Sequence, residues 1–425
     1  MEFGQIFAIA VFVLVMAAIM TEKIHRTLAA LAGAAALLVA HVMPFDTAIG
    51  HIDYNTLGVL FGMMLFVAVV RESGLFEFLA IKTAKAAKGN PWRIMVMFAV
   101  LTAVLSAFLD NVTTVLLIGP MTLTICKILD ISPIPYFLIE IMASNIGGTA
   151  TLIGDPPNIM IGSAAGYTFF DFIMVDTPAV LVIMVAVIAV YYVVFGRSMH
   201  VSEGDRRRVM ELDERDQIHD STLMRQSIAV LVLVVFGFMF HGALGIESSV
   251  VAMTAAAVLL LVSRRDISKA LMHVEWTTLA FFAGLFVIVG GLVETGTVDT
   301  LAQGLIDLTG GSTFETMLVL LVGSALVSSF LDNIPFVATM IPILLAMESS
   351  GMDVTPLWWA VSLGACLGGN GTLIGASANV VLSDISAKNG YTISFARYLK
   401  LGFPVMILTI AIAAVYLVLR FPPAG

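Results

Sequence analysis

Charged residues are scarce in this chain. Asp, Glu, Lys and Arg make up 12% of its 425 residues, against about 25% in an ordinary soluble domain. Hydrophobic residues make up 59%, and the mean hydropathy is +1.01. The apolar residues fall in repeated runs of roughly 15–22, the length with which a helix crosses a bilayer. We therefore expect an all-α polytopic membrane protein of the inner or plasma membrane, in contact with membrane lipid.

Other absences narrow the class further. Two cysteines, Cys126 and Cys366, cannot form a disulfide framework. The opening MEFGQ lacks the basic segment of a cleavable signal peptide. The sequence has no Walker A motif, no cluster of zinc ligands and no nucleophile elbow. We therefore expect no enzyme activity, no cofactor and no resident metal, and we interpret the Arg-rich stretch 197–226 as a solvated loop rather than a nucleic-acid site.

The apolar runs give ten candidate spans and two further segments. The segments, about 93–126 and 314–347, each hold the motif FLDN near the middle and a proline nine residues after its asparagine. If each is a re-entrant hairpin, 20 of the 21 Lys and Arg fall on one side, with Arg420 opposite. The positive-inside rule makes that side cytoplasmic, so both termini are predicted outside and the linker inside. The candidate spans are about 4–21, 27–43, 55–70, 134–162, 177–196, 227–241, 249–263, 276–291, 356–382 and 401–419.

The chain repeats itself. FLDN recurs at an offset of 222, at 108–111 and 330–333, and YNTL at 54 matches WTTL at 276. Further on, IGGTATLIGDPPN (146–158) matches LGGNGTLIGASAN (367–379) at an offset of 221. We predict two repeats, 1–196 and 227–425, each with five spans and one hairpin, joined by the charged cytoplasmic linker 197–226. Five crossings invert the second repeat, which is the plan of secondary transporters with a midplane substrate site.

Polar residues inside these apolar segments are the candidate site. A charge at the bilayer centre costs roughly 2.5–3.5 kcal/mol, so Asp110 and Asp332 need partners or a function. Each can cap the second helix of its hairpin, and the exposed tip can also bind an ion. The Gly-rich segments predict breaks whose free backbone groups bind ions, although glycines also allow close helix packing. The candidate substrate- or ion-binding residues are Asp110, Asn111, Thr113, Thr114, Asn145, Gly148, Thr149, Asp155, Asn158, Asp332, Asn333, Gly369, Asn370, Thr372 and Asn379.

Two acids in the first repeat lack a counterpart in the second. Glu140 aligns with Val361, and Asp155 aligns with Ala376. Both are candidates for proton coupling, and the alternative for Glu140 is an interfacial residue that reaches toward the cytoplasm. Cys366 takes the position of Asn145, where a thiol either binds a soft metalloid or packs.

The paired motifs resemble those of a known superfamily over essentially the full length. FLDNVTTVLLIGP, SNIGGTATLIGDPPNIMIG, FLDNIPFVATMIP and LGGNGTLIGASANVV resemble the ion transporter superfamily, specifically the arsenite permease and NhaD-type sodium/proton antiporter family. The chain is also similar to the melanosomal P protein family and, more distantly, to divalent anion/sodium symporters. This resemblance implies a scaffold of spans 1–3 and 6–8, a mobile transport domain, an elevator-like movement, a homodimer and, for some members, a soluble ATPase partner.

The hairpin tips limit the substrate. The anion symporters carry Ser-Asn-Thr there, whereas this chain has Asp in both copies and Val112 or Ile334 in place of Thr. A fixed negative charge repels a dicarboxylate at short range. We therefore expect a small inorganic solute or ion, and the first hypothesis is proton-coupled efflux of arsenite or antimonite. The alternative is sodium/proton antiport with sodium at the tips. Another anion permease is less favoured, as is a passive channel, because two opposed hairpins would block its pore.

Overall fold

The computed structural model describes residues 3–21 and 23–423, and these residues form helices and loops without strands, which confirms the all-α class. The first half contains α1 (Phe3–Thr21), α2 (Arg26–Val39), α3 (Phe45–Gly50), α4 (Tyr54–Arg71), α5 (Leu75–Ala86), α6 (Pro91–Ser106), α7 (Asn111–Ile128), α8 (Ile134–Thr149), α9 (Pro156–Ala165) and α10 (Phe169–Val194). The linker holds η1 (Gly196–Ser198), α11 (Glu203–Met210) and η2 (Glu214–Gln217). The second half contains α12 (Ser221–Leu244), α13 (Ser248–Ser263), α14 (Ile267–Leu271), α15 (Trp276–Glu294), α16 (Thr297–Leu308), α17 (Thr313–Ser328), α18 (Asn333–Ser349), α19 (Thr355–Gly368), α20 (Ser377–Lys388) and α21 (Phe395–Arg420).

Fewer helices than expected are long enough to cross a membrane alone. By length and composition there are seven in the described chain, or eight if the bent pair α16–α17 counts as one span. The predicted count of ten is therefore not confirmed. Two of the predicted spans are short, with 14 residues in α2 and 16 in α13. Two others are interrupted, α8–α9 at residues 150–155 and α19–α20 at residues 369–376, which confirms the predicted breaks.

The segment around the first FLDN folds back on itself. Tyr136, early in α8, donates to the Pro91 carbonyl at the start of α6 (2.8 Å), and Ser106 at the end of α6 donates to the Ser144 carbonyl (2.6 Å). Thus α6 runs parallel to α8. In contrast, α7 begins beside Asn145 and its later residues reach the middle of α8, so it is antiparallel. The chain reverses at residues 107–110, as expected for a hairpin tip.

The second half repeats these relations with the same spacing. The starts of α4 and α15, and those of α7 and α18, are 222 residues apart, and the starts of α9 and α20 are 221 apart. α17 packs on α19 as α6 packs on α8. The halves also exchange partners, since α2 packs on α15 and α13 on α4, while α7 packs on α20 and α18 on α9.

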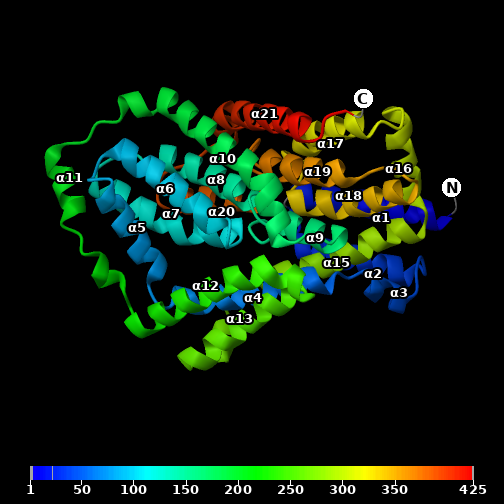
Figure 1. Cartoon of the computed structure of the whole chain (residues 1–425), viewed down its shortest axis with the longest axis horizontal. Coiled ribbons are helices and arrows are strands. Elements are labelled where there is room, and N and C mark those ends of the chain that lie inside the picture. Colours follow the sequence, from blue (N-terminus) through cyan, green and yellow to red (C-terminus); the bar gives the residue numbers. More distant parts are fainter. Residues whose placement is uncertain (1–2, 22, 424–425) are drawn as a thin grey trace.

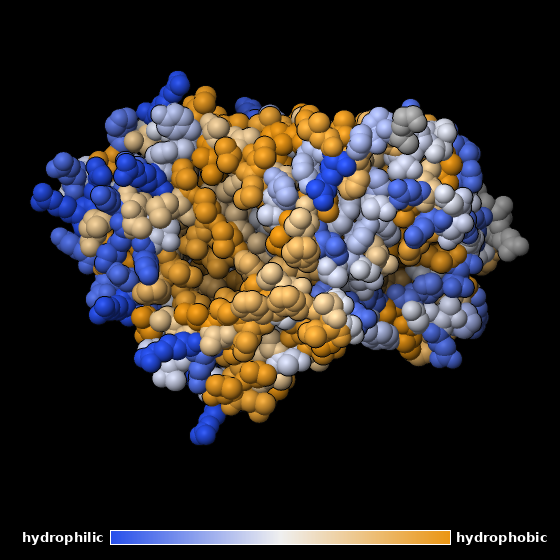
Figure 2. Space-filling view, in the orientation of Figure 1, coloured by the Kyte–Doolittle hydropathy of each residue, from blue (hydrophilic) through white to orange (hydrophobic). Residues whose placement is uncertain are grey.

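Two layers and two polar ends are visible. In Figure 1, α2, α3, α4, α12, α13 and α15 lie below, and the two hairpins with α8, α10, α19 and α21 lie above. The N and C labels are at the right end, whereas α11 is at the left end (Figure 1). Figure 2 shows hydrophilic residues at both ends and apolar residues over α4, α12 and α13. The linker is held to α5 by an ion pair: the Lys85 ammonium group bonds to the Glu214 carboxylate and lowers the pKa of that carboxyl group.

Close approach of α6 to α8, and of α17 to α19, depends on glycine. A Cβ atom at Gly147 would collide with the backbone of Ala103, and one at Gly368 would collide with the backbone of Ala325. The packing interpretation of these glycines is therefore correct. It is compatible with the adjacent breaks, because both glycines precede the point where their helices end.

We expect Gly147→Ala to lower the free energy of unfolding by about 1–3 kcal/mol, because the added methyl group forces the two helices apart. Gly323→Ala is the matched control, since it also lies inside a helix but has no heavy atom within 4 Å of the position that its methyl group would take. Thermal unfolding of the purified protein in detergent measures both. Equal midpoints for the two variants would contradict the packing role.

Candidate ion-binding site between the two hairpin tips

Four buried amides join the two halves. Asn111 at the first tip donates to the Oδ1 atom of Asn145 (3.2 Å). Asn145 in turn donates to the Oδ1 atoms of Asn370 and Asn379, both at 3.0 Å. All four belong to the predicted site, and they come from a hairpin, a broken span and the break of the other half. Their mutual hydrogen bonds satisfy polar groups that would otherwise be costly in an apolar interior, with the exception of the Nδ2 atom of Asn370, which has no partner among the described residues.

Two asparagines, Asn158 and Asn379, bond to the backbone of the interrupted helices. Asn158 donates to the carbonyl oxygens of Gly148, Thr149 and Thr151 at 3.0–3.4 Å. Asn379 donates likewise to the carbonyl oxygens of Gly369 (2.7 Å) and Thr372 (3.0 Å). Each asparagine therefore reaches back ten and seven residues in its own break. These bonds replace the helical ones that the breaks lose, and they position the break beside the tips.

A small cavity lies between the tips and is rich in carboxylates. Asp110, Asp155 and Glu275 line it, together with the guanidinium of Arg26, and its volume is about 30 Å³. Asp110 caps α7 by accepting from the Thr113 backbone (2.8 Å), which confirms the capping role. Among the described residues no group of three His, Cys, Asp or Glu side chains is placed to hold a metal ion. A cation here would therefore use one or two carboxylates with amide or hydroxyl oxygens.

Asp155 joins the first break to the second tip. Asn333 donates its amide to both Asp155 oxygens, at 3.2 and 3.1 Å. The adjoining tip residue, Asp332, caps α18 through the Ile334 backbone N–H (3.1 Å). In both tip motifs the aspartate caps the helix that follows, but Asn111 bonds to α8 of its own half whereas Asn333 bonds to Asp155 of the other half.

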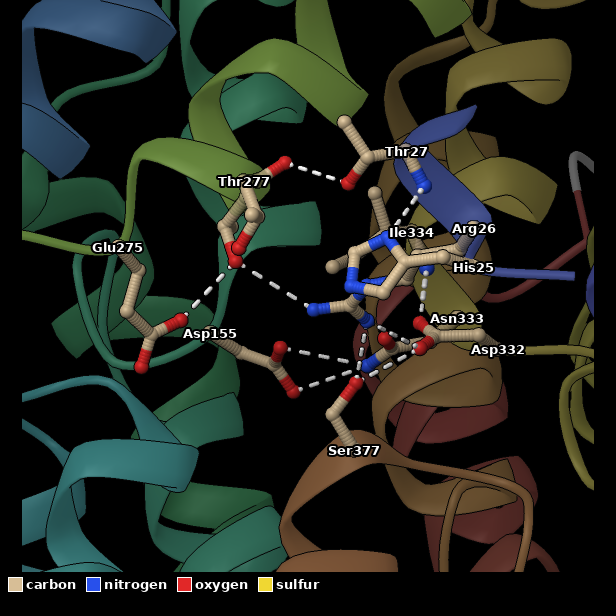
Figure 3. Close-up of polar contacts among 11 residues, drawn as sticks. His25, Arg26, Thr27, Asp155, Glu275, Thr277, Asp332, Asn333, Ile334 and Ser377 are labelled. Carbon is tan, nitrogen blue, oxygen red and sulfur yellow. Dashed lines mark hydrogen bonds and ion pairs between the residues drawn. The ribbon is translucent and has the colours of Figure 1, made fainter. Parts of the chain in front are cut away.

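Arg26 places a positive charge beside the carboxylates of the cavity and of the second tip (Figure 3). Its guanidinium is 3.3 Å from the Oδ2 atom of Asp332 and 2.7 Å from the Ser377 hydroxyl. It also lies over the ring of Phe281, 5.3 Å from the centroid. The charge pattern predicts Arg26 in a cytoplasmic loop, yet its side chain contacts the tip of the second hairpin. The ion pair links α2 in the lower layer to α18 in the upper layer.

Some predicted site residues lie apart from the cavity. Glu140 is buried and accepts from Thr122, so it does not snorkel toward an interface, but it does not line the cavity. The Thr114 hydroxyl is buried without a hydrogen-bond partner. Cys366 is buried beside Asn158, with its thiol 3.6 Å from the amide oxygen, and it is not among the residues lining the cavity.

The structure adds four residues that motif comparison missed. Arg26, Glu275, Thr278 and Ser377 all line the cavity. For Glu275 and Thr278 the sequence held a signal, because an acid and a threonine, Asp53 and Thr56, stand 222 residues earlier. In the structure the Thr278 hydroxyl donates to Glu275 (2.9 Å), and the Thr56 hydroxyl likewise donates to Asp53. Arg26 gives no such signal, because its equivalent position in the second half is Ser248.

A helical protein with apolar helices of membrane-crossing length, in which hairpin tips meet interrupted helices at a charged cavity, has the features of a membrane transporter. The chain belongs to the CitMHS family, described as citrate transporter, whose model matches residues 16–364. The narrower arsenite permease and NhaD-type assignment is not confirmed.

The chain is also similar to curated relatives in sequence and to a solved structure in fold. The uncharacterized transporter Rv2684 of Mycobacterium tuberculosis is 45% identical over 424 residues, covering 98% of this chain and 99% of that protein. The P protein of Homo sapiens is 33% identical over 503 residues, covering 98% of this chain and 60% of that protein. The YdaH transporter of Alcanivorax borkumensis has a similar fold, with a TM-score of 0.61, 17% identity, and coverage of 89% and 88% of the two chains.

We expect Asn145→Ala to lower the free energy of unfolding by about 2–4 kcal/mol, because it leaves the amides of Asn111, Asn370 and Asn379 short of partners. The exposed Asn389→Ala, which loses bonds to Lys127 and Ile385, is the control, with an expected change below about 0.5 kcal/mol. Chemical or thermal unfolding in detergent compares them. Similar losses for both would argue against the amide network.

Proposed function

We propose that this chain is a proton-coupled secondary transporter of a small monovalent cation, with sodium/proton antiport as its function. One observation carries the proposal. Three carboxylates, Asp110, Asp155 and Glu275, line the cavity, and the cation beside them, Arg26, is already paired with Asp332. Three carboxyl groups around one cavity, beside a guanidinium that is paired elsewhere, favour a cation or a proton there to balance their charge.

The size of the cavity supports a small ion. A volume of about 30 Å³ holds one or two water-sized species, since one water needs roughly 10–15 Å³ of such space. Backbone carbonyls and amide oxygens from the tips complete the set of hard oxygen ligands that alkali cations use. A substrate with several carbon atoms would need a different conformation of the site.

The division of charges between the layers supports an elevator-like cycle. Asp110, Asp155 and Asp332 belong to the hairpins and the first break, whereas Arg26 and Glu275 belong to the layer that we propose as the scaffold. When the transport domain moves, Asp332 leaves Arg26 and requires another positive charge. A sodium ion on one passage and protons on the return passage meet that requirement, which couples the two fluxes.

Arsenite efflux, the first hypothesis from the sequence, finds less support in this cavity. Trivalent arsenic prefers thiols, and the thiol of Cys366 does not line the cavity. Uncharged arsenous acid could still bond to the carboxylates, so arsenite is included below as a competing substrate.

Citrate, named in the family description, is a second candidate because of an adjoining cavity. This cavity has a volume of about 370 Å³ and is lined by His25, Arg26, Asp332 and Ser377 beside apolar side chains. Its volume lies in the usual range of small-molecule sites. Arg26 contacts both cavities, so it could bind one carboxylate of citrate. Asp332 would repel the others unless a cation accompanied the anion.

The two inverted repeats, the outward-facing termini, the cytoplasmic linker and the homodimer belong to this proposal. The arrangement of both termini opposite the linker in Figure 1 agrees with an even number of crossings. A soluble ATPase partner is not needed for the proposed exchange, because the ion gradients supply the driving force.

The proposal is tested in vesicles that contain the purified protein and a trapped pH indicator. We expect external sodium to collapse an imposed pH gradient, and we expect Asp110→Asn and Asp332→Asn each to reduce the rate at least about tenfold, because each removes a charge from the site. Asp299→Asn, an exposed acid on α16, is the control. Proton flux driven by citrate or arsenite but not by sodium would overturn sodium/proton antiport in favour of that substrate.

We expect Arg26→Gln to lower the half-saturating sodium concentration about two- to fivefold, because the cation no longer competes with an internal ion pair of about 0.5–1 kcal/mol. The same vesicles give this number from the sodium dependence of the initial rate. Arg225→Gln, an exposed arginine on α12, is the matched control. An unchanged half-saturating concentration would mean that Arg26 does not compete with the ion.

A further inference from the structure

Asp176 is a third buried acid, besides Glu140 and Asp155, and it does not line the central cavity. Asp176, on α10, is 0% exposed. Its Oδ2 atom is 2.7 Å from the Ser362 hydroxyl on α19, and its Oδ1 atom is buried with no hydrogen-bond partner. Asp176 forms no ion pair in the described part of the chain. A carboxyl group in such a position needs either a charge partner or a proton.

The hydrogen bonds around Asp176 are one donor short. The Ser362 hydroxyl is within bonding distance of two acceptors, Asp176 Oδ2 (2.7 Å) and Asn158 Oδ1 (2.8 Å). A hydroxyl group has one hydrogen to donate. The amide hydrogens of Asn158 are already directed to the carbonyls of the first break. The Cys366 thiol, at 3.6 Å from Asn158 Oδ1, is a weak donor.

We propose that Asp176 is a proton-binding site that is linked to the first helix break through Ser362 and Asn158. With a proton on Asp176, every bond has a donor, because Asp176 donates to Ser362, Ser362 donates to Asn158, and Asn158 donates to the break carbonyls. Without that proton, Ser362 turns to the carboxylate, and Asn158 Oδ1 retains only the thiol. Protonation therefore changes the support of the break that carries Asp155. This inference rests on the proposed proton coupling and extends it to a residue outside the cavity.

The two halves differ in the group that donates to the side-chain oxygen of this asparagine. In the second half, Asn379 accepts from the amide of Asn145 at 3.0 Å, a full-strength donor that does not titrate. The position equivalent to Asn145 is Cys366, so Asn158 depends on Ser362 instead. Within the described residues, the bonds from Asn158 through Ser362 therefore lead to a carboxyl group, whereas Asn379 accepts from an amide.

The groups around Asp176 do not pair its carboxyl group with a positive charge. Cys366 on α19 and Tyr416 and Arg420 on α21 interact with it electrostatically. The Tyr416 hydroxyl donates to the carbonyl of Val175 (2.6 Å), not to Asp176. His241 on α12, which also packs against α10, meets the backbone of Phe169. No hydrogen bond or ion pair within residues 3–21 and 23–423 joins a cationic side chain to Asp176.

The test compares the intact protein with Asp176→Asn, Ser362→Ala and the exposed control Asp299→Asn in vesicles. Infrared spectroscopy as a function of pH reports protonated buried carboxyl groups directly. We expect a carboxylic-acid band in the intact protein, in Ser362→Ala and in the control, and the loss of one component of that band in Asp176→Asn, because the buried acids Glu140 and Asp155 are retained. Transport gives the second measurement, in which we expect both Asp176→Asn and Ser362→Ala to flatten the pH dependence of the half-saturating sodium concentration at least about threefold.

Two results would overturn the inference. One is a carboxylic-acid band in Asp176→Asn identical to that of the intact protein. The other is an unchanged pH dependence in both folded variants, with sodium/proton exchange intact, which leaves the proposed function standing. Absence of sodium/proton exchange in the intact protein would refute the proposed function instead, and the infrared band would still decide whether Asp176 holds a proton.

Discussion

Backbone polar groups inside a membrane protein must find partners within the protein, and the two interrupted spans create the largest demand for such partners. Asn158 and Asn379 meet it in the same way, each bonding to carbonyls ten and seven residues earlier. Because these asparagines lie at the starts of α9 and α20, their bonds fix how each broken helix resumes. The hairpin tips then bond to the first interrupted span, Asn111 to Asn145 in α8 and Asn333 to Asp155 in the break. The positions of Asp110, Asp155 and Asp332 depend on this arrangement, because they lie on the tips and the first break.

The two halves share a framework but differ in their buried charged side chains. Both tips have the same aspartate cap and the same asparagine, but Asp155, Glu140 and Asp176 occur in the first half alone, and Arg26 has no cationic counterpart. An exact two-fold arrangement would bind its ion symmetrically and would leave nothing to distinguish a cation from a proton. The unpaired acids and Arg26 break that equivalence at different places in the fold, and in the proposed antiport they would give the two coupled species separate sites.

Much of the local structure could be predicted from the sequence. The helix breaks, the FLDN tips and the capping role of Asp110 and Asp332 follow from short-range rules for glycine, proline and N-cap residues. The grouping of Asn111, Asn145, Asn370 and Asn379 followed from the matched motifs. The span count did not, because apolar length alone does not show which segments form continuous helices of full length: two predicted spans, 27–43 and 249–263, are the short helices α2 and α13, and two others are interrupted. Arg26 was missed because loop charges were interpreted only by their side of the membrane.

The sequence by itself determined an all-helical membrane transporter, its two matched halves and the residues at each tip and break, since these depend on composition and on contacts between near neighbours in the chain. Only the tertiary structure decided which tip faces which break, and which side chain neutralises which carboxylate. Arg26 and Asp332 are separated by 306 residues, and Asp176 and Ser362 by 186. Such pairs form because the helices of the two halves exchange packing partners, and no local pattern in the chain encodes that exchange.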